Sequence, residues 1–246
     1  MENPDRAAIL ITGAAKRLGL SIAHHAAAQG LDIALHCHHS LTEANNAASE
    51  LQQGCGVFQA DLSDIECLDA LVSNVTTQFP RLRALVNCAS VFAPSKMSEE
   101  TDEFVMNTLQ TNLLAPWKLA RLCSSHWQER SDGLIVNFTD QRLTRAAQGH
   151  FAYNISKHGL KAFTEIAALE LAPHTRVNAI APGVILAPPE IDEPNAVAEF
   201  LQRKGNEVPL QRSGTEAEIG NAFDYLLNNE FVTGQTLFVD GGEHLS

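Results

Sequence analysis

The sequence predicts an α/β protein with a doubly wound parallel sheet of about seven strands flanked by helices. Two observations carry this prediction. Short aliphatic and β-branched runs alternate with longer helical segments along most of the 246-residue chain. A glycine-containing turn follows the first of these runs and leads directly into a helix. Such alternation favours parallel strands joined by crossover helices.

The elements follow one another in a regular order. Strands are expected at residues 7–12, 32–37, 57–62, 84–89, 134–139, 176–182 and 236–240. Helices are expected at residues 18–30, 42–53, 65–78, 101–127, 151–172 and 216–227. We expect one domain over residues 1–246. Alternation weakens between Gly183 and Val208, and this segment is predicted to be either a substrate lid or an ordinary surface excursion.

Charge and cysteine content narrow the classes of function. The net charge is −12 and no basic run occurs, which disfavours nucleic acid or an anionic membrane as a partner and favours a small ligand. The first residues carry acids where a secretion signal needs positive charge, so we expect a soluble, cytoplasmic protein. Five cysteines form an odd set without C-x-x-C pairs, which indicates reduced thiols and no metal site.

A tyrosine and a lysine one helical turn apart are the strongest chemical signal. Tyr153 and Lys157 stand at i and i+4, so both side chains project from one helix face. The ammonium lowers the pKa of a phenol and makes it a usable general acid. Asp140 lies upstream and opposes that effect, which leaves the tyrosine protonated and able to donate. An isolated pair at this spacing is more often a helix-surface pair without a role.

The glycine-containing turn favours phosphate binding. It runs from Thr12 to Gly19 at the start of a helix, where small residues let the backbone approach a pyrophosphate. Arg17 stands where many such turns carry another glycine, and we expect its cation to reach both cofactor phosphate and substrate pocket. The alternative is a tight strand-to-helix turn with no ligand.

The end of the second strand indicates NADP(H) rather than NAD(H). It lacks the acid that would bind ribose hydroxyls, whereas Lys16, Arg17, His39 and Ser40 could all donate to a 2′-phosphate. His36 and His38 fall on the same strand end, and at least one of them is expected in solvent. Further along the chain, contacts to the cofactor are expected from Asp61, Leu62, Asn87 and Ala89, although strand-end turn chemistry is the alternative.

TGAAKRLG, NCAS, Asn112, YNISK and APGV, in this order, resemble the short-chain dehydrogenase/reductase family. Arg17, HCHHS, Ser90, Phe92 and Asp140 resemble its pteridine reductases, and the segments IVNFTD and FVTGQTLFVDGGEHLS its bacterial dihydromonapterin reductases. The resemblance implies a Rossmann-type domain, NADPH as hydride donor and a homotetramer. Cofactor contacts are then expected from Gly13, Lys16, Arg17, Leu18, Gly19, His39, Ser40, Asp61, Leu62, Asn87, Ala89, Lys157, Pro182 and Gly183.

The resemblance also implies roles for the reacting groups. Tyr153 would donate the proton, Lys157 would bind the nicotinamide ribose and lower the pKa of the tyrosine, and Asn112 would support the lysine through water. Asp140 takes the position of the family's catalytic serine. Phe92 would stack on a pterin ring, and Ser90 and Arg17 would help to hold ligand and cofactor, although a phenylalanine after a strand is more often a core residue.

The aspartate favours an imine-like substrate over a ketone. An ionised carboxylate cannot donate to a developing alkoxide, whereas at a pterin C=N bond Asp140 can relay a proton through Tyr153 to the ring nitrogen. We therefore expect an NADPH-dependent reductase of dihydropterins: 7,8-dihydromonapterin first, dihydrobiopterin next and dihydrofolate weakly. Two alternatives stay open: a generic carbonyl or 3-oxoacyl reductase, and an NADP(H)-binding protein without turnover.

Overall fold

The computed structural model describes residues 6–51, 54–145 and 148–246. Within them, seven parallel strands form one sheet in the order β3-β2-β1-β4-β5-β6-β7. The strands are β1 (Ala8–Thr12), β2 (Asp32–Cys37), β3 (Cys55–Gln59), β4 (Leu82–Asn87), β5 (Gly133–Phe138), β6 (Thr175–Pro182) and β7 (Thr236–Val239). The α-helices are α1 (Arg17–Ala28), α2 (Leu41–Leu51), α3 (Leu68–Gln78), α4 (Asp102–Leu109), α5 (Ala115–Ser124), α6 (Phe151–Glu170), α7 (Pro194–Gly205) and α8 (Glu216–Asn228).

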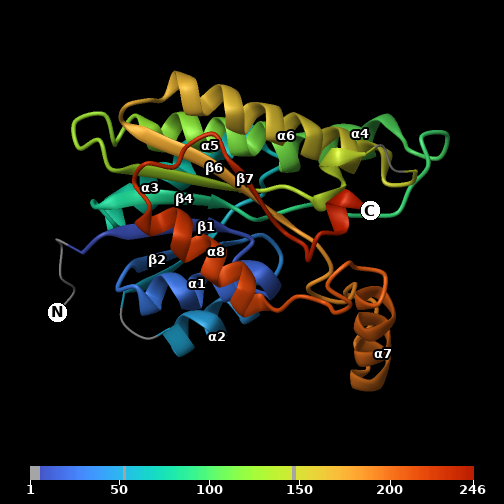
Figure 1. Ribbon diagram of the computed structural model, residues 1–246. Coiled ribbons are helices and arrows are strands. Elements are labelled where there is room, and N and C mark those ends of the chain that lie inside the picture. Colours follow the sequence, from blue (N-terminus) through green and yellow to red (C-terminus); the bar gives the residue numbers. More distant parts are fainter. Residues whose placement is uncertain (1–5, 52–53, 146–147) are drawn as a thin grey trace.

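Helices cover both faces of the sheet, as expected for a doubly wound fold (Figure 1). Residues of α1, α2 and α8 pack with Ile9 and Ile11 on one face. Residues of α3, α5 and α6 pack with Ala8 and Leu10 on the other. Because successive strand side chains point to opposite faces, a strand covered on both sides must be apolar at every position, and β1 is buried throughout.

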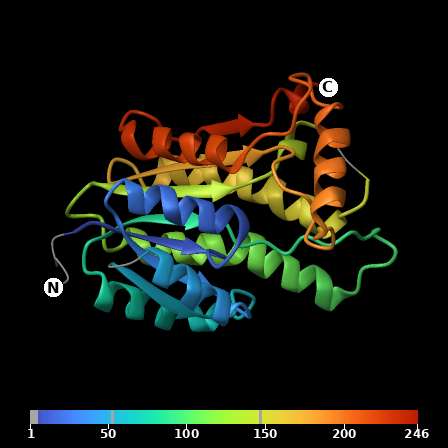
Figure 2. The same ribbon diagram turned by 90° about the horizontal axis from the view of Figure 1, so that it is seen from below.

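The strand order places a topological switch point at β1, between β2 and β4. The chain runs outward in one direction through β2 and β3 and in the other through β4 to β7. Ligands of open α/β sheets bind beyond the carboxyl ends of strands at such a point. Figures 1 and 2 both show α7 and the C-terminus beyond these strand ends, so the site is expected there.

The predicted elements are found, although several bounds shift by up to three residues: β3 is Cys55–Gln59 rather than 57–62, so Asp61 and Leu62 follow the strand. Residues 52–53 of the helix expected at 42–53 lie outside the described residues.

Two further differences concern helices. The helix expected at residues 101–127 is α4 and α5 joined by a π-helical turn, Gln110–Leu114. The segment from Gly183 to Val208 contains α7, which the weakening alternation did not reveal. Prolines and acids dominate its start, and its helical part has few apolar residues, of which Val197, Phe200 and Leu201 lie on one half-buried face. Among the described residues, no helix has the length and apolar character to span a membrane.

Candidate active site

Tyr153 and Asp140 are joined directly by a hydrogen bond. Tyr153 lies in the first turn of α6, and Asp140 follows β5, where it caps the short 3₁₀ helix Gln141–Thr144. Tyr153 Oη donates to Asp140 Oδ2 at 2.6 Å, and the Arg142 N–H donates to Asp140 Oδ1 at 2.8 Å. One carboxylate oxygen is thus held by the main chain while the other accepts from the phenol.

Lys157 lies one turn further along α6 and is almost completely buried. Its Nζ donates to the Phe138 carbonyl at 2.7 Å and lies 5.6 Å from the centre of the Tyr153 ring. Burial lowers the pKa of Lys157 to about 8, although the negative charge of Asp140 opposes that change. The structure therefore brings the three residues of the predicted proton-delivery set to one place.

The pKa of Tyr153 moves opposite to the direction expected from the lysine alone. Burial, followed by the charge and the hydrogen bond of Asp140, raises the pKa of Tyr153 well above its ordinary value, and Arg142 opposes the increase only in part. The expected lowering of the Tyr153 pKa by Lys157 is therefore not found, and burial together with Asp140 sets the direction. Tyr153 is a protonated donor at neutral pH.

Asn112 lies in the π-helical turn and is fully committed to protein contacts. Its side chain accepts from the Val91 N–H at 2.8 Å and donates to the Val91 carbonyl at 2.9 Å and to Ser156 Oγ at 3.1 Å. Ser156 in turn donates to the Tyr153 carbonyl at 2.7 Å. This amide ties the loop after β4 to α6 next to the tyrosine. Support of Lys157 through water stays a prediction.

Phe92 is not a core residue, because 46% of its surface is exposed. Its ring stacks on His150 with centroids 4.3 Å apart and meets the Tyr153 ring edge-on at 4.7 Å. The Arg142 guanidinium lies 5.6 Å from the ring centre. Ser90, two residues earlier, is also exposed. Sequence reasoning missed His150 and Arg142, since nothing in the spacing places either residue beside Phe92.

The glycine-containing turn has the tight geometry expected of it. Gly13 has φ +66°, and a Cβ there would lie 2.9 Å from the Ala89 Cα. Arg17 also adopts a positive φ of 55°, which explains why related turns carry glycine at this place. Arg17 Nη2 donates to the Ala187 carbonyl at 2.9 Å, so this cation connects the turn to the segment predicted as a lid.

His36 is buried behind the glycine turn. Its Nδ1 accepts from the Gly13 N–H at 3.2 Å, which leaves Nε2 to donate to the Ala60 carbonyl at 3.1 Å. Burial lowers the pKa of His36 to about 4, so the ring is neutral. His38 is half-exposed, and its Nε2 lies 3.7 Å from Asp61 Oδ2. Of the two histidines, only His38 reaches solvent; His36 has a structural role that the sequence did not indicate.

The predicted donors to a 2′-phosphate lie around the start of α1 and the end of β2. Lys16, Arg17 and His39 are exposed and Ser40 is half-buried. Lys16 currently pairs with Glu43 at 2.5 Å, both side chains being about half exposed. Such an exposed pair is weak and can be exchanged for a phosphate contact.

The side chains of the other predicted cofactor residues differ in their burial and in their hydrogen bonds to the protein. Asp61 accepts from the Ser63 N–H at 2.9 Å, and the neighbouring Leu62 is buried. Asn87 is buried and donates to Asn137 at 2.9 Å, so its side chain belongs to a core network between β4 and β5. A cofactor contact from its side chain remains a prediction.

At the far end of the site, Pro182 closes β6 and Gly183 follows it. The Gly183 N–H donates to the Val239 carbonyl at 3.1 Å, and a Cβ on Gly183 would lie 2.6 Å from the Asp240 Cβ. No side chain other than hydrogen fits here without a shift. Across the described residues, no group of three histidine, cysteine or acidic side chains could hold a metal ion.

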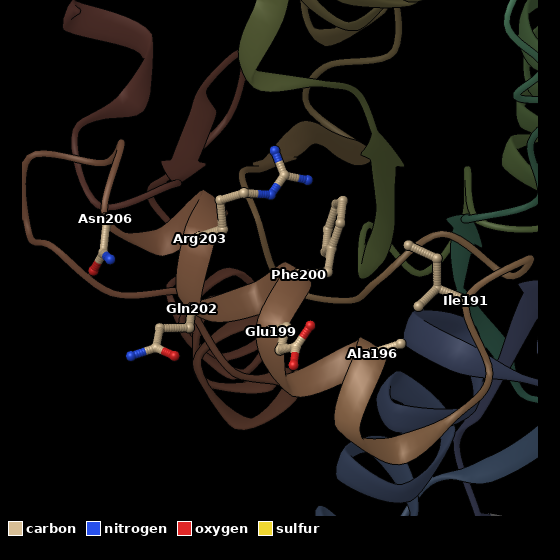
Figure 3. Close-up of a pocket in the computed structure, with 7 residues that line it drawn as sticks. All are labelled: Ile191, Ala196, Glu199, Phe200, Gln202, Arg203 and Asn206. Atoms are coloured by element: carbon tan, nitrogen blue, oxygen red, sulfur yellow. The ribbon is translucent and has the colours of Figure 1, made fainter.

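The segment from Gly183 to Val208 is held mainly at its ends. Within α7 only Gly205 is buried, packed against Arg212 and Ser213. Along α7 lies an open hollow of about 790 Å³, shown in Figure 3, where the Arg203 guanidinium lies 5.5 Å from the Phe200 ring centre. None of the proton-delivery residues lines this hollow. The candidate active site is instead the Tyr153 region, because Tyr153, Asp140 and Lys157 meet there.

The glycine-containing turn after β1, at the topological switch point, and the Tyr153–Lys157 pair define a dinucleotide-dependent oxidoreductase of the Rossmann type. A family profile described as "Enoyl-(Acyl carrier protein) reductase" matches residues 13–244. The chain belongs to the short-chain dehydrogenase/reductase family.

Individual relatives are similar along their whole length. The chain is 32% identical to the dihydromonapterin reductase of Citrobacter koseri, covering 96% of each protein, and 32% identical to that of Enterobacter sp. strain 638, covering 100% of each. Among solved structures, the FolM alternative dihydrofolate reductase 1 of Brucella canis, complexed with NADP, matches with a TM-score of 0.88 and 34% identity over 98% of this chain and 95% of that one.

Proposed function

We propose that this protein is an NADPH-dependent reductase of dihydropterins, with 7,8-dihydromonapterin as the preferred substrate, dihydrobiopterin next and dihydrofolate weaker. The observation that carries the proposal is the 2.6 Å hydrogen bond from Tyr153 to Asp140 beside the exposed ring of Phe92. A phenol backed by a carboxyl group suits protonation of a ring nitrogen, and an exposed aromatic plane suits a flat heteroaromatic ligand. The names of the dihydromonapterin reductase relatives support the same substrate class.

The residues around the glycine turn would hold the cofactor. The glycine-containing turn would bring its backbone N–H groups to a pyrophosphate at the start of α1, and Lys16, Arg17, His39 and Ser40 offer donors to a 2′-phosphate. Bound NADPH supplies hydride. Lys157 would bind the ribose, Tyr153 would deliver the proton, and Asp140 would replace it. Arg17, Ser90 and Phe92 would orient the substrate. The NADP in the Brucella canis structure supports this choice of cofactor.

A direct assay tests this function. The purified protein is expected to oxidise NADPH with 7,8-dihydromonapterin at a kcat/KM well above that with dihydrofolate or simple ketones. NADPH is expected to be preferred over NADH. Turnover of ketones without turnover of any dihydropterin would contradict the substrate assignment, and equal kcat/KM values for NADPH and NADH would contradict the cofactor assignment.

The main alternative is a generic carbonyl or 3-oxoacyl reductase of the same fold. Asp140→Ser separates the two functions, because a serine hydroxyl can donate to a carbonyl oxygen whereas an ionised carboxylate cannot. Improved ketone turnover in this variant would favour the alternative. A cofactor binder without turnover would show tight NADP(H) binding and no activity on either substrate class.

The remaining parts of the proposal concern organisation. We propose one domain over residues 1–246, with residues 183–208 as a lid. We also propose a homotetramer, because exposed apolar side chains gather on α4, α5 and α6: Met106, Trp117, Ile155, Ile166 and Leu169. Size-exclusion chromatography with light scattering measures the molar mass in solution and so tests the number of subunits. The five free cysteines support a cytoplasmic location.

A further inference from the structure

Arg142 lies beside the proton-delivery residues, although its position in the sequence did not indicate a role there. It is the second residue of the 3₁₀ helix Gln141–Thr144, and its N–H donates to Asp140 Oδ1 at 2.8 Å. Its guanidinium lies 5.6 Å from the centre of the Phe92 ring, which meets the Tyr153 ring edge-on at 4.7 Å. Arg142 is therefore next to two groups that both contact the phenol.

The 3₁₀ helix that carries Arg142 is held by the C-terminal turn of the chain, Glu243–Leu245. Gln141 Nε2 donates to Glu243 Oε1 at 3.2 Å, and Thr144 Oγ1 donates to the His244 carbonyl at 2.8 Å. These two contacts flank Arg142 along the chain. Its main chain is therefore fixed relative to the site.

The positive charge of Arg142 has no counter-ion in direct contact. Among the described residues, its half-buried guanidinium forms neither an ion pair nor a hydrogen bond and lies over the Phe92 ring. Glu243 is nearby, but burial, followed by the charges of Asp240 and Asp140, raises the pKa of Glu243 and weakens it as a counter-ion. An arginine stays charged throughout the pH range in which proteins are studied. Negative charge that develops near Arg142 is therefore stabilised by it.

Proton delivery creates such a negative charge on Tyr153. Once the phenol has given up its proton, the phenolate oxygen faces the Asp140 carboxylate across the contact that measures 2.6 Å in the structure. Two like charges so close together repel each other strongly inside a protein. A neighbouring cation stabilises this charged state more than the neutral phenol, and it thereby lowers the barrier to proton delivery.

The charged and titratable groups that face Tyr153 come from two elements. Asp140 and Arg142 approach it from the segment after β5. Lys157 and His150 approach it from α6 and its N-cap, with the Lys157 Nζ 5.6 Å and the His150 ring centre 6.3 Å from the centre of the Tyr153 ring. The loop after β4 contributes an uncharged aromatic ring. The cation that opposes the Asp140 charge must therefore come from these few groups.

Lys157 is a weaker counter-charge than its place on α6 suggests. Its Nζ donates to the Phe138 carbonyl at 2.7 Å, and burial lowers its pKa to about 8. Part of the lysine population is thus neutral in mildly alkaline solution, whereas Arg142 remains charged. Burial and then Asp140 raise the pKa of Tyr153, and Arg142 is the cation that opposes them.

We propose that Arg142 is a positioning residue whose charge stabilises the Tyr153 phenolate that forms during proton delivery. This inference rests on the proposed function. Hydride with its electron pair passes from NADPH to the ring carbon, and the Tyr153 proton passes to the ring nitrogen, so one hydride and one proton reduce the C=N bond. A proton from water then restores the phenol by way of Asp140. Arg142 exchanges no proton in this sequence.

Arg142→Gln removes the charge and leaves the main-chain hydrogen bond to Asp140 in place. We expect the rate of hydride transfer to dihydromonapterin, measured from NADPH absorbance in a single turnover, to fall by about tenfold. KM should stay within about twofold, because the charge acts on a state formed during the reaction and not on bound substrate. Arg142→Lys keeps a cation and should recover most of the rate.

A matched control removes an arginine from a similar environment away from Tyr153. The Arg121 guanidinium lies 5.7 Å from the Trp117 ring centre on α5, and Arg121→Gln should leave the rate unchanged. An unchanged rate in Arg142→Gln would overturn the proposal. Equal losses in Arg142→Gln and Arg142→Lys would also overturn it, since packing would then be the cause, as would a raised KM at an unchanged rate, which indicates a substrate contact. Arg142→Met is a second neutral variant with the same expected loss, in case the first does not fold.

A measurement without substrate or cofactor distinguishes failure of this inference from failure of the proposed function. The chain has two tyrosines, Tyr153 and Tyr225, so incorporation of 3-fluorotyrosine gives two ¹⁹F NMR signals, which Tyr225→Phe assigns. Fluorine makes the phenol more acidic, and Asp140→Asn removes the carboxylate that opposes its ionisation.

In this background, adding Arg142→Gln should move the Tyr153 titration midpoint to higher pH by about half a pH unit or more, because the cation that favours the phenolate is gone. An unchanged midpoint overturns the inference. A raised midpoint in a protein that reduces no dihydropterin supports the role of Arg142 and contradicts only the proposed function.

Discussion

The region around Tyr153 and the segment around α7 lie beyond the same strand ends but are built in opposite ways. Tyr153, Lys157 and His36 are at most 8% exposed, and each is held by hydrogen bonds to side chains or backbone. In α7 only Gly205 is buried. Under the proposed function, Tyr153 and Lys157, which would act in every turnover, are preorganised, whereas the part expected to meet variable substrate atoms is left adjustable.

The largest effect is expected from Tyr153→Phe, which removes the proton donor and keeps the ring. Turnover of dihydromonapterin should fall by about 10²- to 10⁴-fold, the usual contribution of a positioned general acid. NADPH affinity, measured by fluorescence titration, should stay within about threefold, because the cofactor residues do not depend on the phenol. A variant that retains wild-type kcat would show that the preorganised region is not the reacting one.

Gly13→Ala tests the packing of the preorganised region. The new methyl group would lie 2.9 Å from the Ala89 Cα, at a backbone φ of +66°. Strain and overpacking together should cost about 2–4 kcal/mol in the free energy of unfolding and should weaken NADPH binding. Urea unfolding measures the first quantity. Gly30→Ala is a suitable control, since its φ is +82° but nothing lies within 4 Å of a Cβ there.

His36 predicts a pH dependence of stability. Burial depresses the pKa of His36 from 6.5 to about 4 in the folded protein. Between these values the unfolded chain binds a proton that the folded chain does not, so stability is complete above pH 6.5 and falls as the pH drops toward about 4. The loss amounts to roughly 3 kcal/mol.

His36→Gln checks this assignment, because glutamine can accept from Gly13 and donate to Ala60 without titrating. Urea unfolding at several pH values should show a flatter slope in the variant over this window. The same slope in both proteins would assign the acid sensitivity to other groups.

The smallest effect on stability is expected in the adjustable segment. Phe200 is half-buried beneath Arg203, so Phe200→Ala should change the free energy of unfolding by only about 0.5 kcal/mol. If α7 closes over substrate, KM for dihydromonapterin should rise by up to about tenfold with little change in kcat. Unchanged KM together with a clear loss of stability would reverse the comparison between the two regions.

The pattern of apolar residues along the sequence was sufficient to predict most of the strands and helices. The strand runs and the helices between them were predictable because a sheet covered on both faces needs uninterrupted apolar strands, and its helices need one apolar side. α7 was missed, because its short apolar pattern, Val197, Phe200 and Leu201, follows a stretch rich in prolines and acids. The π-helical turn at Asn112 was also missed; the side chain of Asn112 bonds there to Val91 and Ser156, which are distant in sequence.

The candidate site also has features that the sequence predicts and features that only the folded chain shows. The spacing of Tyr153 and Lys157 on one helix face follows from helix geometry and is present in the sequence itself. The direction of the Tyr153 pKa was decided by burial and by the Asp140 hydrogen bond, and both depend on how the end of β5 meets α6. Likewise, only the folded chain places His36 behind Gly13 and Glu243 against Gln141.

The sequence by itself determined the order of strands and helices along the chain, the candidate phosphate-binding turn and the candidate reacting groups, since these depend on neighbours a few residues apart. Tertiary structure alone decided which charges are desolvated, which donors and acceptors are paired, and which distant segment joins the site. Electrostatic effects depend on distance and burial in three dimensions, and neither can be read from separation along the chain.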